Sequence, residues 1–182
     1  MLTSHQLGTN TGLRVSKLCL GTMNFGEPGQ GHQGDWTLGA DDARPIFQAA
    51  IEHGVNYFDC ADIYGIGASE IVVGKLLKEL LPRDEYTLTT KVSMPMGRAP
   101  NQGGLSRKHI MEGIDQSLKR LGHDYVDQLI IHRHPHGIPG LAQTPIEETM
   151  EALNDVVKAG KALYLGASSM FAWQFAELQM TA

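Results

Sequence analysis

The stretch "TPIEETMEALNDVVKAGKALYLGAS", residues 144–168, reads as a helix followed at once by a strand. Thr144 is the expected N-cap, Pro145 takes the first helical position, and Glu147 stands where a capping box needs a carboxylate. Gly160 then ends the helix, and the short apolar run at 162–168 predicts a strand. This helix-strand unit sets the pattern to look for in the rest of the chain.

The same alternation continues toward the N-terminus. We predict strands at 16–22, 55–60, 86–92, 125–132 and 162–168. We predict helices at about 43–53, 69–80, 106–122 and 144–160. A strand therefore recurs roughly every 32 to 40 residues, which is the length of one strand-helix unit. Strict alternation of this kind predicts a parallel sheet covered by helices.

Two architectures satisfy that pattern, the doubly wound sheet and the (β/α) barrel. The segment "GTMNFGEPGQG", residues 21–31, does not open into a helix as a dinucleotide-binding GxGxxG turn would. We therefore predict an α/β (β/α)8 TIM barrel truncated to about its first five units, with residues 1–182 forming a single, incomplete domain. Because a closed barrel takes eight units and about 250 residues, open edge strands are expected, and self-association through them is a possible partner interaction.

Composition narrows the class of protein. The 182 residues are 42% hydrophobic and have a net charge of −5, which is typical of a globular domain with a sizeable core. No basic stripe indicates binding to nucleic acid or an anionic membrane. The N-terminus lacks the pattern of a signal peptide, so we expect a cytoplasmic protein in which Cys19 and Cys60 are reduced core residues.

Polar residues gather at the predicted carboxyl ends of the strands, where barrel enzymes place their chemistry. These residues are Asp59, Lys91, His132, Ser168 and Ser169, with Tyr64 in the loop after Asp59. Each alone has a structural explanation, since a lone lysine is usually solvated and a lone aspartate usually caps a turn.

Four of these residues together predict one proton-transfer site. Asp59 and Lys91 would form a charge pair, and a lysine beside Tyr64 would favour the phenolate and lower its pKa from about 10. The imidazole of His132 could hydrogen-bond a carbonyl oxygen. We therefore predict Asp59, Tyr64, Lys91 and His132 as the catalytic residues.

The segments "FDCADIYG", "TKV", "LGHDYVDQLIIHR" and "ALNDVVKAGKALYLGASS" resemble the aldo-keto reductase family, especially bacterial and fungal members acting on small or aromatic aldehydes. The resemblance implies NADPH-dependent reduction of an aldehyde or ketone to an alcohol. Tyr64 would supply the proton, tuned by Lys91 and Asp59. His132 would orient the substrate.

The resemblance also implies a set of cofactor contacts. The set comprises Gly21, Thr22, Met23, Asp59, Ser168 and Ser169. Ser169 departs from the family pattern, in which many relatives have Asn. The family barrel has three further strand-helix units, which carry the loops for the adenosine phosphate, so we expect the isolated chain to bind NADPH poorly.

Two other functions remain open. The family includes channel-associated β subunits in which partner binding outweighs reductase chemistry, although some of those replace the equivalent of His132 by Asn. His132, His134 and His136 alternate like the ligands of a metal site on one strand face. However, Pro135 interrupts the strand and no carboxylate or thiolate lies at ligand spacing, so we expect no metal.

The substrate is expected to lie among loop residues. Phe25, Trp36, Met94 and Arg133 should rim the pocket, which favours an aldehyde with an apolar or aromatic body. The glycine-rich segment 26–36 is expected to be a mobile loop over the site.

Overall fold

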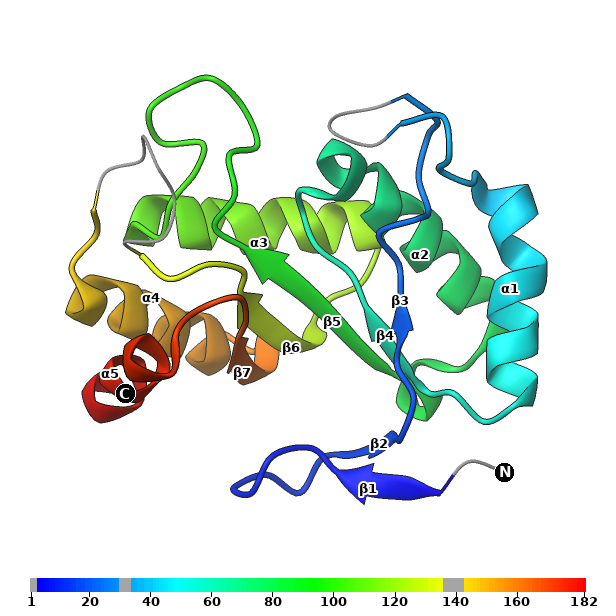
Figure 1. Ribbon diagram of the computed structural model, residues 1–182, viewed down its shortest axis with the longest axis horizontal. Helices are drawn as coiled ribbons and strands as arrows, with labels where there is room; N and C mark the ends of the chain where they lie inside the picture. The colour runs from blue at the N-terminus through cyan, green and yellow to red at the C-terminus, as the bar shows by residue number, and fades with distance from the viewer. Residues whose placement is uncertain (1–2, 30–33, 136–142) are drawn as a thin grey trace.

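The computed structural model describes residues 3–29, 34–135 and 143–182. Its main sheet has five parallel strands, hydrogen-bonded in chain order (Figure 1). They are β3 (Leu20–Gly21), β4 (Tyr57–Asp59), β5 (Thr87–Val92), β6 (Val126–Ile131) and β7 (Ala162–Ala167). The parallel order and the alternating helices confirm the predicted α/β class and are consistent with part of a (β/α) barrel.

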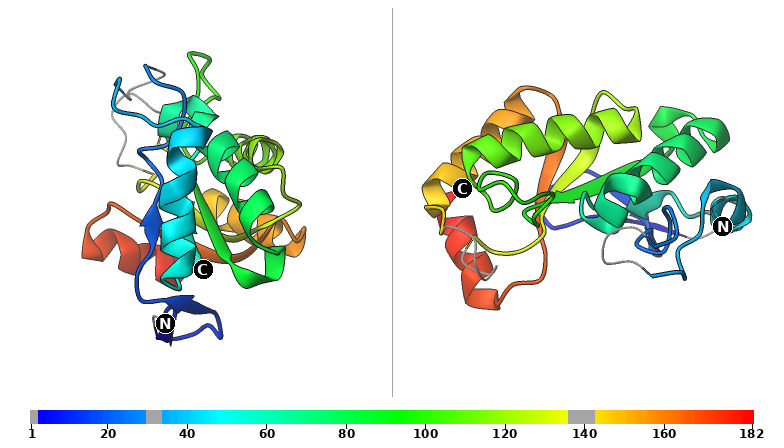
Figure 2. Two further views of the ribbon diagram at one scale, coloured as in Figure 1. Left: turned by 90° about the vertical axis from the view of Figure 1, so that its right-hand side faces the viewer. Right: turned by 90° about the horizontal axis from the view of Figure 1, so that it is seen from above.

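The helices cover the outer face of the curved sheet (Figure 2). They are α1 (Ala40–Glu52), α2 (Ala68–Leu80), α3 (Arg107–Leu121), α4 (Ile146–Lys158) and α5 (Ala172–Thr181), with the short 3₁₀ turns η1 (Tyr64–Gly67) and η2 (Arg83–Glu85). Each α-helix contacts the next one along the chain. A Cβ at Gly74 of α2 would lie 2.0 Å from the backbone oxygen of Leu121, so glycine allows α2 to approach α3 closely.

The core lies between the sheet and these helices. Phe47 of α1 stacks on Phe58 of β4, with ring centroids 5.6 Å apart, and Phe25 packs on Phe47 at 5.2 Å. Leu88 of β5 and Ile114 of α3 are fully buried in the same cluster. This packing holds the carboxyl ends of β4 and β5 in fixed positions.

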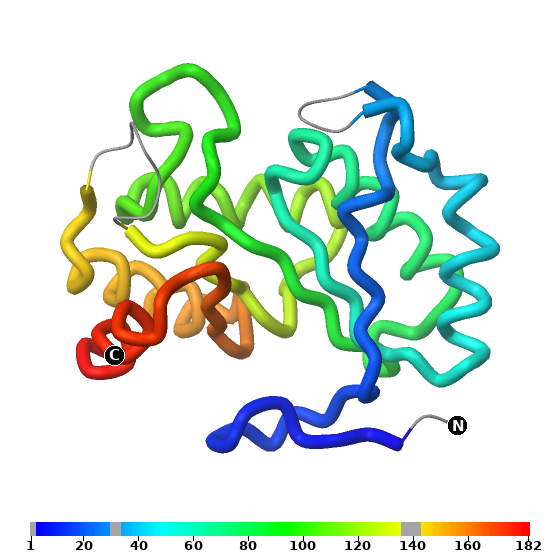
Figure 3. Tube along the Cα trace, viewed as in Figure 1, coloured from blue at the N-terminus to red at the C-terminus, as the bar shows by residue number. Residues whose placement is uncertain are grey.

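The predicted first strand at 16–22 proved to be two elements. Ser16 belongs to β2 (Arg14–Ser16), which pairs antiparallel with β1 (Ser4–Gln6), and β3 begins only at Leu20. Figure 3 shows this hairpin beyond the amino ends of the sheet, away from the loops that follow the strands.

Two further predictions were wrong. The helix predicted from Thr144 begins at Ile146, and no side-chain cap bond from Thr144 or Glu147 closes its first turn, because Pro145 itself takes the N-cap position. Cys60 is buried as predicted, but Cys19 is exposed, because it precedes an edge strand that has a neighbour on one side only.

No helix among the described residues is both long and apolar enough to span a membrane.

Candidate active site

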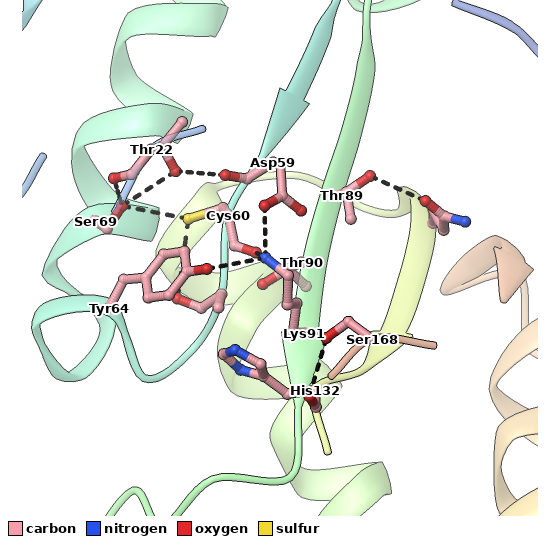
Figure 4. Close-up of polar contacts among 12 residues, drawn as sticks. Thr22, Asp59, Cys60, Tyr64, Ser69, Thr89, Thr90, Lys91, His132 and Ser168 are labelled. Atoms are coloured by element: carbon pink, nitrogen blue, oxygen red, sulfur yellow. Dashed lines mark hydrogen bonds and ion pairs between the residues drawn. The ribbon is translucent and has the colours of Figure 1, made fainter. Parts of the chain in front are cut away.

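Lys91 is the centre of the polar cluster at the carboxyl ends of the strands (Figure 4). Its ammonium group donates to Asp59 Oδ2 at 2.7 Å, to the Cys60 carbonyl at 2.7 Å and to Tyr64 Oη at 3.2 Å. These three bonds use all three N–H donors of the lysine. Burial opposes its charge, but Asp59 and Tyr64 outweigh that effect and raise the pKa of Lys91 above its ordinary value. Lys91 is therefore a buried, charged group aimed at the phenol.

Strand register brings Asp59 to Lys91. Asp59 pairs with Gly21 on one side and Thr89 on the other, so it ends β4 two residues below the level of Lys91 in β5. The Asp59 carbonyl also accepts from the backbone N–H of Thr22 at 3.0 Å and from its hydroxyl at 2.9 Å. β3 and β4 are thus tied together at the site.

Tyr64 reaches the lysine because the chain turns sharply after β4. Gly65 and Gly67 take left-handed conformations with φ of 57° and 90° in the turn η1, which carries Tyr64 back over the strand ends. A Cβ at Gly67 would lie 2.4 Å from Cδ of Arg120, so glycine also makes room for the arginine.

Arg120 belongs to a polar network on the opposite face of β5. Its Nε donates to Glu70 at 2.6 Å, and the hydroxyl of Thr90 donates to the other Glu70 oxygen at 2.5 Å. Glu70 and Thr90 are fully buried. Because Thr90 precedes Lys91, this network fixes the strand that presents the lysine.

His132 follows β6 and completes the cluster. Its ring lies edge-on to Tyr64, with centroids 5.9 Å apart and planes at 86°. The backbone of His132 is fixed on both sides, since its N–H donates to the Val92 carbonyl at 3.0 Å and its carbonyl accepts from the Ser168 hydroxyl at 2.9 Å. Burial, followed by the charges of Lys91 and Arg133, lowers the pKa of His132 to about 4, so the ring is neutral at pH 7.

The residues predicted to contact the cofactor differ in their surroundings. Thr22 is buried, and its hydroxyl donates to the Asp59 carbonyl. The Ser168 hydroxyl donates to the His132 carbonyl. Gly21 borders open space, since no atom would lie within 4 Å of a Cβ there. Ser169 is exposed with φ of 52°, a left-handed conformation that asparagine adopts more readily than serine.

A hollow of about 250 Å³ opens over Tyr64 and His132. Met23, Trp36, Ile63, Met94 and Arg133 line it with them. Of the four residues predicted to rim a pocket, Trp36, Met94 and Arg133 therefore do so. Phe25 does not, because it is buried against Phe47 in the core.

The three histidines separate. His134 is buried and its ring lies 6.2 Å from that of Trp173 in α5, whereas His136 lies outside the described residues. Within the described ranges, no group of three His, Cys, Asp or Glu side chains could hold a metal ion.

A second cavity, of about 120 Å³, lies on the helix side of the sheet and was not predicted. Asp62 and His109 line it, and both carboxyl oxygens of Asp62 and Nε2 of His109 are buried with no hydrogen-bond partner among the described residues. Burial, followed by the nearby Glu70 carboxylate, raises the pKa of Asp62 well above its ordinary value. Asp62 therefore ionises less readily than an ordinary aspartate, and it lies close in sequence to Tyr64 of the polar cluster.

Some supporting residues gave a weak signal in the sequence. Glu70 interrupts the apolar run "SEIVVG", and a carboxylate among core residues usually has a buried partner. Nothing in the sequence identified Arg120 as that partner, or Ile63 as part of the hollow, because both depend on how helices and loops fold over the strands.

The parallel strands, with a carboxylate, an ammonium, a phenol and an imidazole gathered at their carboxyl ends, define a protein of the (β/α)-barrel class. The sequence matches the family model described as "Aldo/keto reductase family" over residues 17–182, and the chain belongs to that family.

Individual relatives agree with this assignment. The chain is 42% identical to versiconal hemiacetal acetate reductase of Aspergillus parasiticus, covering 93% of this chain and 52% of that protein. It is 41% identical to a probable voltage-gated potassium channel subunit beta of Arabidopsis thaliana, over 92% of this chain and 47% of that protein. The crystal structure of a thermostable aldo-keto reductase with the inhibitor epalrestat superposes with a TM-score of 0.81 at 28% identity, covering 100% of this chain and 59% of that one. The chain thus spans about half the length of the curated relatives it matches.

Proposed function

We propose that this chain contains the proton-transfer site of an NADPH-dependent carbonyl reductase, which reduces aldehydes or ketones to alcohols in the cytoplasm. One observation carries the proposal: Lys91 Nζ bonds both Asp59 and Tyr64 while the neutral ring of His132 lies beside the phenol. The fungal reductases among the relatives support the class of reaction.

Each residue has a chemical task in this reaction. Tyr64 donates its phenolic proton to the carbonyl oxygen, and the Lys91 ammonium stabilises the phenolate that remains. Asp59 balances the charge of Lys91 and holds its Nζ in place. His132, neutral at pH 7, donates an N–H to the same carbonyl oxygen and orients the substrate.

The described residues fit the nicotinamide end of the cofactor. Open space at Gly21 adjoins Asp59, and the exposed hydroxyl of Ser169 is close to the end of β7. The bound reduced nicotinamide supplies the hydride that the carbonyl carbon accepts. We propose that Gly21, Met23 and Ser169 contact this ring and that Thr22 and Ser168 hold their neighbours in place.

NADPH oxidation in the presence of a panel of aryl aldehydes tests the function, with NADPH in excess to offset the weak binding we expect. Tyr64→Phe should lower turnover by about 10²- to 10⁴-fold, the usual contribution of a general acid. Tyr57→Phe is the matched control, since its hydroxyl bonds Gln128 rather than Lys91. Equal turnover in wild type and Tyr64→Phe would refute the proposal.

A partner-binding scaffold is the second candidate, favoured by the similarity to the Arabidopsis channel subunit beta. A scaffold does not need proton transfer at Tyr64. Absence of aldehyde-dependent NADPH oxidation in wild type, with NADPH shown to be bound, would favour it over the reductase.

A further inference from the structure

Arg133 is a cation in a hollow that is otherwise mostly apolar. Met23, Trp36, Ile63 and Met94 form the apolar part, and Tyr64 and His132 form the floor where the chemistry is proposed. A substrate lying on the floor would therefore have apolar side chains around its body and one guanidinium group at its margin.

The backbone of Arg133 is fixed in place. Its N–H donates to the hydroxyl of Ser93, a fully buried residue at the end of β5, at 3.1 Å. His132 before it is bonded to Val92, and His134 after it is buried. The side chain of Arg133 itself is exposed, so the fold presents this guanidinium at the hollow from a rigid base.

Within the part of the chain that the structure describes, no ion pair neutralises the charge of Arg133. Arg44, Arg83, Arg107 and Arg120 each form an ion pair, but among the described residues no carboxylate pairs with Arg133. Lys91, the other cation near the floor, is already paired with Asp59. Arg133 is thus the charge in the hollow that is available to a ligand.

We propose that Arg133 binds a carboxylate on the substrate, so that the hollow selects aryl aldehydes carrying one acidic group. This inference rests on the proposed reductase function and specifies its substrate class. A planar guanidinium binds a carboxylate through two parallel hydrogen bonds. One unpaired cation in an apolar setting suits a monocarboxylate better than a phosphate dianion, which would need more positive charge.

An NMR titration of the full chain tests this binding without any turnover. The indole N–H of Trp36 reports occupancy of the hollow, and Trp173→Phe assigns its signal. The ligands are 4-formylbenzoate and the neutral 4-methylbenzaldehyde, which share the ring and the aldehyde. Arg133→Met should weaken binding of 4-formylbenzoate roughly tenfold, the effect of losing one charge-assisted interaction of about 1.4 kcal/mol. The same substitution should change the affinity for the neutral aldehyde by less than about twofold.

Arg133→Lys keeps the charge but loses the planar pair of N–H donors, so it should bind 4-formylbenzoate with intermediate affinity. Arg98→Met is the matched control, because Arg98 is exposed in the loop after β5 but does not line the hollow. Equal affinity of wild type for the two ligands, or an equal loss in Arg98→Met, would overturn the proposal. If binding of 4-formylbenzoate depends on Arg133 but Tyr64→Phe does not change turnover, only the reductase function would be refuted.

Discussion

Two regions differ in how far their side chains are satisfied by contacts within the described chain. They are the carboxyl ends of β4 to β6 and the β7–α5 end of the molecule. At the strand ends, Lys91 has a partner for each of its three donors. At the β7–α5 end, large apolar side chains face solvent, with Leu163 48% exposed, Trp173 62% and Phe171 71%. The donors of Lys91 are all satisfied, whereas the β7–α5 end presents apolar surface for which the described residues show no partner.

The difference follows from position in the sheet. β4, β5 and β6 each have a parallel neighbour on both sides, whereas β7 is an edge strand paired only with β6. The bonds of Lys91 come from residues 59–64, and from the β7 end Ser168 joins the cluster through its N–H to the Ile131 carbonyl and its hydroxyl to the His132 carbonyl. The contacts of Lys91 are therefore made away from the exposed β7–α5 surface.

Glu70→Gln should have the largest effect on stability. It leaves the guanidinium of Arg120 without its counter-charge at a buried site and weakens the anchor of Thr90, so unfolding free energy should fall by about 3–5 kcal/mol. Urea denaturation measures this. Glu112→Gln is the control, since its pair with Lys108 is exposed on α3 and should contribute only about 0.3–0.5 kcal/mol. Similar losses in the two variants would show that the network behind β5 is not a structural anchor.

Asp62→Asn should have a smaller effect with the opposite sign. The pKa of Asp62 is raised in the folded chain, whereas in the unfolded chain Asp62 ionises at its ordinary pKa of about 3.8. Unfolding above that pH releases a proton, so the contribution of Asp62 to stability falls as pH rises toward the raised folded value. Asparagine cannot ionise, so the stability of the variant relative to wild type should be greater at pH 8 than at pH 4.

The gain in stability from Asp62→Asn over wild type should shrink as the pH falls from 8 toward 4. Thermal melts of both proteins between these two pH values measure it. Asp127→Asn provides the contrast, because Asp127 is buried but accepts from Arg83 and from the Leu88 N–H, so its loss should destabilise the fold. A gain in stability that grows toward acid pH would contradict the raised pKa of Asp62 in the folded chain.

The sequence could predict the catalytic cluster because strand ends follow from the alternation of strands and helices. Asp59 and His132 each follow an apolar run, Lys91 lies near the end of the predicted strand 86–92, and parallel strands place such residues at one edge. Their proximity is now seen, while their roles stay predictions. The raised pKa of Asp62 could not be predicted, because it depends on burial beside a cavity between α3 and the loop after β5 and on the charge of Glu70.

Local signals also misled at two points. Thr144 and Glu147 match a capping box, but Pro145 between them fixes the backbone so that the helix starts one residue later. The continuous run at 16–22 looks like one strand, but its two ends pair with different strands. Ser16 pairs with β1, and Leu20 pairs with β4. Both errors concern boundaries: Pro145 decides the first locally, and pairing with strands distant in sequence decides the second.

Phe171→Ala should have the smallest effect and tests the comparison between the two regions directly. Phe171 precedes α5 with most of its ring in solvent, so its removal should change unfolding free energy by less than about 0.5 kcal/mol. Phe47→Ala is the matched control, since this ring is fully buried between Phe25 and Phe58, and its loss should cost about 3–5 kcal/mol. If the exposed surface mediates the self-association that open edges predict, Phe171→Ala should also weaken it in sedimentation velocity runs. A large loss of stability in Phe171→Ala would show that the β7–α5 end is packed in solution, and the contrast with the strand ends would then be wrong.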